Sequence, residues 1–111
     1  MKITDIIEKL NLEVFSGQAG LENEIDGGYV SDLLSDVMGN AKQGQVWITL
    51  QNHKNSLAVA SLKDLSAIIL VKGIKPGEDT ISKSEEEGIP LLGSGEDTFT
   101  VAGKLYSLIA E

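Results

Sequence analysis

Cysteine is absent from this sequence of 111 residues, and histidine occurs once, at position 53. Without thiolates, the chain can form no disulfide, no cysteine-ligated zinc site and no iron–sulfur cluster on its own side chains. One histidine and scattered acids do not make a metal-ligand cluster, so we expect no metal and no cofactor. The composition suits a reducing compartment, and we therefore expect a cytoplasmic protein.

Basic residues are scarce. Nine of them stand against 17 aspartates and glutamates, which gives a net charge of −8. This charge repels phosphate backbones and anionic lipid surfaces and leaves no basic stripe for them to dock on. Long apolar runs are also missing, since no uninterrupted apolar stretch approaches membrane-spanning length. We expect no nucleic-acid partner, no membrane partner and no secretion.

The apolar content is sufficient for a packed core. Hydrophobic residues make up 41% of the chain, whereas disordered chains are poor in such residues. A chain of this length usually builds a single core. We expect one domain over residues 1–111.

The chain is organised around residues 45–72. Residues 46–50 and 67–71 are apolar at nearly every position, which is typical of strands covered on both faces in a parallel sheet flanked by helices. Between them lie a polar corner at 51–55 and a helical segment at 57–65 that is apolar around much of its circumference. This order predicts a parallel crossover, with the segment 57–65 buried in the core or against another subunit.

Shorter patterns predict the remaining elements. Helical periodicity or polar surface composition indicates helices at 3–10, 33–38 and 79–87, and brief apolar runs indicate strands at 12–15, 29–30 and 89–92. The final helix has Asp97 or Thr98 as its cap and a predicted buried stripe of Phe99, Ala102, Leu105 and Ile109. Ser31 or Asp32 is expected to cap the helix at 33–38, and Asn55 or Ser56 the next one. The predicted fold class is α/β, three-layered, with a mainly parallel sheet of about four strands flanked by helices.

Open parallel sheets bind ligands beyond the carboxyl ends of their strands, near helix N-termini that favour anions. In this sequence the loops at that edge are 51–55, 72–77 and 93–97. They bring lysines, amides and glycines to one crevice, which favours a small anionic ligand, although ordinary turns without a ligand have the same composition. The candidate ligand-binding residues are Thr49, Gln51, Asn52, His53, Asn55, Lys72, Gly73, Lys75, Ser94 and Asp97.

Catalytic motifs are weak. Gly39 and Gly44 have the spacing of a phosphate-binding loop, but Gln45 and Val46 stand where its lysine and hydroxyl are needed. His53 has no neighbouring carboxylate in sequence to orient it as a base. We therefore expect no catalytic residue, and a helix-capping or solvated histidine is the simpler interpretation.

Several segments resemble the DRTGG domain. They lie at residues 32–38, 44–49, 58–62, 75–76, 88–90 and 97–99, so the resemblance covers nearly the whole chain. The DRTGG domain is similar to the N-terminal domain of HPr kinase/phosphorylase. The resemblance implies a three-layer α/β fold like that domain, a regulatory or ligand-sensing role and frequent self-association. The kinase domain with its phosphate loop is absent from this chain, so kinase activity is not implied.

The function we expect is that of a non-catalytic regulatory or ligand-sensing module, homodimeric and able to bind a small anionic metabolite or nucleotide. Two alternatives remain open at this point. One is a small hydrolase or transferase in which His53 acts with a carboxylate from Asp32 or Asp97. The other is a structural subunit of a larger redox or signalling complex, built with a partner protein.

Overall fold

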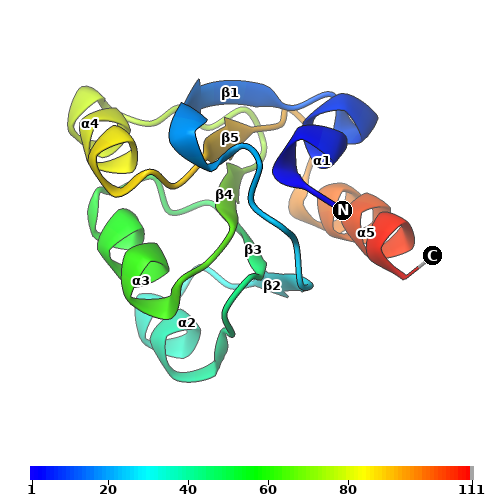
Figure 1. Cartoon of the computed structure of the whole chain (residues 1–111), viewed down its shortest axis with the longest axis horizontal. Helices are drawn as coiled ribbons and strands as arrows, with labels where there is room; N and C mark the ends of the chain where they lie inside the picture. The colour runs from blue at the N-terminus through cyan, green and yellow to red at the C-terminus, as the bar shows by residue number, and fades with distance from the viewer. Residues whose placement is uncertain (111) are drawn as a thin grey trace.

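A five-stranded sheet lies between two layers of helices in the computed structural model, which describes residues 1–110 (Figure 1). The strand order is β1-β5-β4-β3-β2, in which β2 to β5 run parallel and β1 pairs antiparallel with β5. The strands are β1 (Glu13–Ser16), β2 (Gly28–Val30), β3 (Val46–Thr49), β4 (Ala67–Leu70) and β5 (Leu91–Gly93). The predicted three-layer α/β architecture is confirmed, with five strands where about four were expected.

The two central strands are the ones that the apolar runs predict. Every residue of β3 and of β4 is buried, and the two strands pair in parallel with Ile48 opposite Ile69. Three successive crossovers, through α2 (Leu34–Asn40), α3 (Asn55–Lys63) and α4 (Glu78–Glu87), join the parallel strands. These three helices cover the same face of the sheet (Figure 1).

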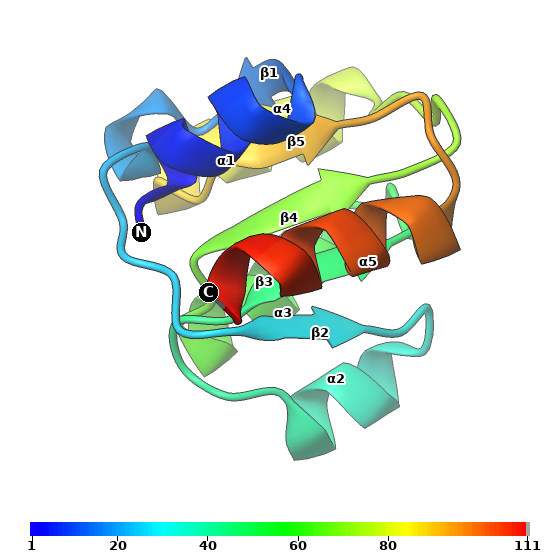
Figure 2. The ribbon, with the colours of Figure 1, turned by 90° about the vertical axis from the view of Figure 1, so that its right-hand side faces the viewer.

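The opposite face is covered by α1 (Ile3–Leu10) and α5 (Thr98–Ile109), which lie over the sheet in Figure 2. Alternate strand residues divide the core between the two layers. Trp47 and Ile68 pack toward α2, α3 and α4, whereas Ile48 and Ile69 pack toward α1 and α5. Within the described residues, three helices therefore cover one face of the sheet and two cover the other.

The helix caps follow the predictions in part. Asp97 caps α5, with its Oδ1 accepting a hydrogen bond from the Thr100 N–H at 2.8 Å, as predicted. Asp32 does not cap α2, whose N-cap is Leu33; its carboxylate binds the end of β3 instead. The N-cap of α3 is Lys54 rather than Asn55 or Ser56. Neither N-cap residue accepts a hydrogen bond with its side chain. The nearby side-chain acceptors are the Ser31 hydroxyl, which accepts the Leu33 N–H at 3.2 Å, and His53 Nδ1, which accepts the Asn55 N–H at 3.1 Å.

The predicted buried stripe of α5 is correct at Leu105 and at the partly buried Ala102, and wrong at Phe99. Val101 and Leu105 are each 2% exposed, but Phe99 is 87% exposed. The helix turns Val101 and Leu105 onto the sheet and α1, since these residues, four apart, lie on one face. Phe99 and Ile109 then fall on the outer side.

Over residues 1–110, no helix combines the length and the apolar character needed to cross a lipid bilayer.

Candidate functional site

The carboxyl ends of β3, β4 and β5 open at one edge of the sheet, and the loops that follow them are tied together. The Lys72 N–H donates to the Glu96 carbonyl at 2.8 Å, and the Gly73 N–H donates to the Ser94 carbonyl at 2.9 Å. The Asn52 side-chain amide donates to the Lys75 carbonyl at 2.8 Å. The three loops predicted to form the crevice therefore lie side by side.

Thr49 and Gln51 form hydrogen bonds with the loop that follows β2. The Thr49 hydroxyl donates to the Asp32 carboxylate at 2.9 Å, and the Gln51 side chain donates to the Asp32 carbonyl at 2.8 Å. The Leu50 N–H reaches the same carboxylate oxygen at 2.7 Å. These contacts fix the loop after β2 to the end of β3, so Thr49 and Gln51 stabilise this edge of the sheet.

His53 lies at the start of α3. Its Nδ1 accepts the Asn55 N–H at 3.1 Å, so the imidazole acts as a local cap, as the simpler interpretation predicts. The two carboxylates considered as catalytic partners are used elsewhere, Asp32 at the end of β3 and Asp97 at the start of α5. Over residues 1–110, no hydrogen bond or ion pair joins His53 to a carboxylate. This geometry does not favour the hydrolase or transferase alternative.

Lys72 has an unusual backbone conformation. Its φ is +60°, in the left-handed region that L-residues with a side chain rarely adopt. Of the non-glycine residues in the described chain that share this region, Asn11 and Asp64 are helix C-caps, where the conformation is common. Lys72 instead follows a strand at the edge of the sheet. Gly73, next to it, also has a positive φ of +70°.

The Lys72 side chain is exposed, and in residues 1–110 its ammonium takes part in no ion pair or side-chain hydrogen bond. Asp97 lies near it. The Thr100 N–H, followed by the Thr100 hydroxyl, holds the pKa of Asp97 below its ordinary value, and the positive charge of Lys72 lowers this pKa further. Lys72 and Asp97 are therefore brought together, as the loop argument expects.

Lys75 lies at a small hollow of about 260 Å³, which Gly73 and Ser94 also line. Its ammonium forms an ion pair with Glu13 at 2.9 Å and sits 5.3 Å from the centre of the Phe15 ring. Glu13 offsets the charge of Lys75, so Lys72 offers the less neutralised cation at this edge.

No group of three or more histidine, aspartate or glutamate side chains in the described chain is arranged to hold a metal ion.

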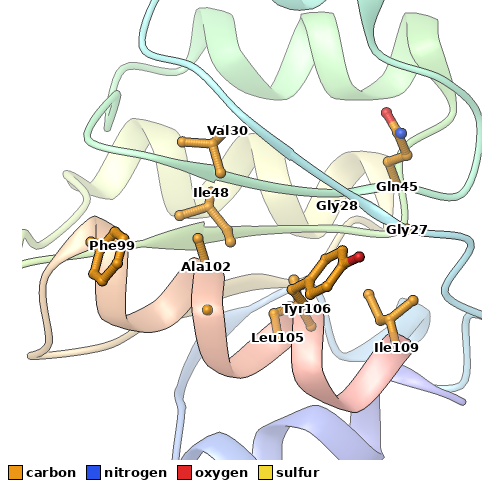
Figure 3. Close-up of a pocket in the computed structure, with 11 residues that line it drawn as sticks. Gly27, Gly28, Val30, Gln45, Ile48, Phe99, Ala102, Leu105, Tyr106 and Ile109 are labelled. Carbon is orange, nitrogen blue, oxygen red and sulfur yellow. The ribbon is translucent and has the colours of Figure 1, made fainter. Parts of the chain in front are cut away.

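The structure has a second concavity that the sequence did not predict. An apolar groove of about 530 Å³ runs between β2 and the outer side of α5. Figure 3 shows Phe99, Tyr106 and Ile109 projecting from α5 on the side that faces Val30 and Ile48. The available signal was that α5 carries more large apolar residues than one stripe can bury, with Tyr106 outside the predicted stripe.

Comparisons with known proteins agree with this fold. A match to the DRTGG domain family covers residues 5–108. Among curated proteins, no sequence matches the chain. The structure is similar to that of the CBS and DRTGG domains of the regulatory region of Clostridium perfringens pyrophosphatase, crystallised with the activator diadenosine tetraphosphate.

The TM-score to that structure is 0.76 at 15% sequence identity, which shows a shared fold. The similarity covers 94% of this chain but only 45% of the clostridial chain, so this chain spans less than half the length of that relative. The resemblance seen in the sequence is confirmed by the family match, which extends over nearly all of the residues. The chain belongs to the DRTGG domain family.

Proposed function

We propose that this chain, as one domain over residues 1–111, is a non-catalytic regulatory module of the cytoplasm that binds a small anionic metabolite or nucleotide. The ligand site lies at the carboxyl edge of β3, β4 and β5, and the protein acts as a homodimer. The observation that carries the proposal is Lys72, an exposed lysine held in the left-handed region at that edge.

Backbone strain away from helix ends is most often retained where it has a function. At Lys72 the strained backbone aims an exposed ammonium from the point where the loops after β4 and β5 are joined by two backbone hydrogen bonds. Gly73 and Gly95 lie beside it, and an added Cβ at either would meet no heavy atom of residues 1–110 within 4 Å. A ligand can therefore approach the backbone closely.

The charges around Lys72 limit the affinity of the site. Glu96 is paired with Lys104 at 2.8 Å, which offsets its repulsion of an anion. Asp97 remains ionised, because its pKa is lowered. A single exposed ammonium contributes roughly 1–4 kcal/mol to the binding of a charged group in contact with it. We therefore expect binding in the micromolar range or weaker, where a regulatory site responds to metabolite concentration.

The choice of ligand class rests on chemistry and on the related structure. A polyphosphate offers several anionic oxygens to a lysine and to a nearby hydroxyl donor such as Ser94. The structurally similar clostridial regulatory region was crystallised with diadenosine tetraphosphate as its activator. That nucleotide and simpler nucleotides are therefore the first probes, followed by acyl phosphates and sugar phosphates.

Isothermal titration calorimetry with these compounds tests the proposal. We expect one of them to bind wild-type protein and Lys72→Gly to weaken its affinity about tenfold or more, since glycine keeps the backbone conformation and removes the charge. Lys42→Ala is the matched control, because Lys42 is an exposed lysine that precedes β3 at the opposite edge. If no probe gives heat or a thermal shift, or if Lys72→Gly binds as tightly as wild type, the proposed site is wrong.

A further inference from the structure

The outer side of α5 leaves large apolar side chains in solvent. Phe99 is 87% exposed and Tyr106 is 74% exposed, and both border the groove along β2 (Figure 3). The groove exists because only α1 and α5 cover this face of the sheet within the described residues. Gly28 allows α5 to pack close to β2, since a Cβ at position 28 would lie 3.3 Å from Leu105 Cδ2.

This surface differs from the rest of the protein in charge. None of the residues that line the groove is charged, although 23% of the chain is charged and its net charge is −8. Two copies of a strongly acidic protein repel each other least where their contacting surfaces carry no charge. A surface that binds a cationic partner protein would contain acidic residues, and no acidic residue lines this groove. The groove side of α5 is therefore suited to a second copy of this chain, whereas Lys9 and Lys104 border Phe99 and Gly103 on the other side.

The exposed residues of α5 are also arranged for two-fold contact. Phe99 and Tyr106 lie seven residues apart, or roughly 10 Å along the helix axis. Ala102 and Gly103 lie midway between them, and the space around Gly103 is open, with no heavy atom of residues 1–110 within 4 Å of an added Cβ. A two-fold axis through this midpoint places the Phe99 ring of each copy against the partner's Tyr106. The patch is thus self-complementary, as a symmetric dimer requires.

The two exposed rings supply the centre of a dimer interface, and neighbouring apolar side chains enlarge it. At their exposed fractions the two rings offer roughly 300 Å² of surface to a partner. A stable interface buries about 800 Å² on each partner, with its core made of aromatic anchors. Val30 and Ile109 extend the apolar area next to the rings.

The helix α3 offers no comparable surface. Leu62 is an isolated exposed leucine on this helix, whose Leu57, Val59 and Ala60 are buried in the monomer.

We infer that the exposed face of α5 forms the homodimer contact. Two copies cross antiparallel at Ala102 and Gly103, and each Phe99 ring packs against the partner's Tyr106. This inference rests on the homodimer proposed above and identifies its surface. It is independent of the ligand site at Lys72.

Sedimentation equilibrium of wild type, Phe99→Lys and Tyr106→Glu tests the contact. Each substitution places a charge in the apolar interface, and we expect each to weaken dimerisation at least tenfold. Mixing the two variants restores a dimer at least tenfold tighter than either alone. In the mixed dimer the new ammonium faces the new carboxylate, and the second Phe99–Tyr106 contact is unchanged. Leu62→Lys is the matched control and leaves the dissociation constant of the dimer unchanged.

The outcomes separate this inference from the proposals before it. Circular dichroism melts verify that the variants fold, which their exposure favours. If wild type dimerises and the two α5 variants do so equally well, or if Leu62→Lys alone abolishes the dimer, the α5 contact is overturned and the homodimer stands. If the mixed variants remain monomeric, the antiparallel pairing is overturned. If wild type is a monomer at high micromolar concentration, both the homodimer and its α5 contact fail, while ligand binding is judged by calorimetry.

Discussion

The Asp32 carboxylate accepts the Thr49 hydroxyl at 2.9 Å, and the same oxygen accepts the Leu50 N–H at 2.7 Å. Thr49 is 1% exposed, so its hydroxyl needs a partner inside the protein. Asp32 supplies that partner from the loop after β2 and thereby fixes this loop to the end of β3. The contact holds one side of the edge at which the ligand site is proposed.

Asp32→Ala is expected to lower the free energy of unfolding by about 1–3 kcal/mol, because it leaves a buried hydroxyl and a strand-end N–H without their acceptor. Thr49→Val removes the hydroxyl and keeps the shape of the side chain. Urea denaturation of both single variants and the double variant measures the interaction. We expect a coupling energy of roughly 0.5–1.5 kcal/mol.

Glu86→Ala serves as the control for that cycle. Glu86 is an exposed acid whose only ion pair in residues 1–110 is with Lys83, at 3.8 Å. Its removal should change the free energy of unfolding by less than about 0.5 kcal/mol. A coupling energy of zero between Asp32 and Thr49 would show that the buried contact contributes nothing to stability.

Asp32 also illustrates what local patterns cannot predict. Its position before an apolar helical segment is typical of an N-cap, and the sequence carries no sign that the Leu50 N–H competes for the carboxylate. The two residues are 18 positions apart and meet only because β2 and β3 pair. In contrast, β3 and β4 were predictable, since burial on both faces requires apolar residues at every position.

The exposure of Phe99 on α5 was unpredictable for a similar reason. The sequence of this helix contains two overlapping apolar stripes, one through Val101 and Leu105 and one through Phe99 and Tyr106. Which stripe is buried depends on how many helices cover that face of the sheet. The number of helices on each face is set by the topology of the whole domain and cannot be read from the sequence of α5 alone. The edge with the three loops was predictable, because parallel strands place their carboxyl ends together. The hydrogen bonds that occupy Thr49, Gln51 and His53 there were not.

Lys72→Gly should raise the free energy of unfolding by roughly 0.5–1 kcal/mol. The left-handed region costs a residue with a Cβ about 1–2 kcal/mol, and the greater freedom of glycine in the unfolded chain offsets only part of this gain. Lys72→Ala removes the same charge and keeps the strain, so it should not stabilise. Chemical denaturation of both variants measures the difference.

Asp64→Gly provides a comparison for Lys72→Gly. Asp64 has a φ of +57° as the C-cap of α3, so glycine should relieve strain there too. The gain in stability should be smaller than for Lys72→Gly, because aspartate tolerates this region better than lysine and its carboxylate accepts the Gln43 side-chain amide at 3.0 Å. Binding of an anionic ligand should stay unchanged. If Lys72→Gly destabilises the protein while Asp64→Gly does not, then the Lys72 side chain has a structural role that its exposure does not suggest.

The Tyr29 hydroxyl donates to Asp36 Oδ1 at 2.9 Å, and this bond makes stability depend on pH at both ends of the scale. The pKa of Asp36 is held below its ordinary value of 3.8 by the Ser31 hydroxyl, then by the Tyr29 hydroxyl and the Asn40 amide. The pKa of Tyr29 is raised above its ordinary value of 10.0, chiefly by the hydrogen bond to Asp36.

The direction of each effect follows from which form the folded state prefers. Folded Asp36 prefers to be ionised, so its contribution to stability is complete above pH 3.8 and is lost as the pH falls through its lower folded pKa. Folded Tyr29 prefers to keep its proton, so its contribution is complete below pH 10.0 and is lost as the pH rises through its raised folded pKa.

Tyr29→Phe should therefore flatten the dependence of unfolding free energy on pH at both ends. Denaturation with urea from about pH 3 to about pH 11 measures this, with wild type and variant compared at each pH. Tyr106→Phe is the matched control, since Tyr106 is 74% exposed and its variant should follow the wild-type profile at concentrations where the protein is monomeric. Because Phe keeps the ring and loses only the hydroxyl, two parallel profiles for wild type and Tyr29→Phe would contradict the assigned hydrogen bond. A change confined to the alkaline limb would instead show that Ser31 and Asn40 alone lower the pKa of Asp36.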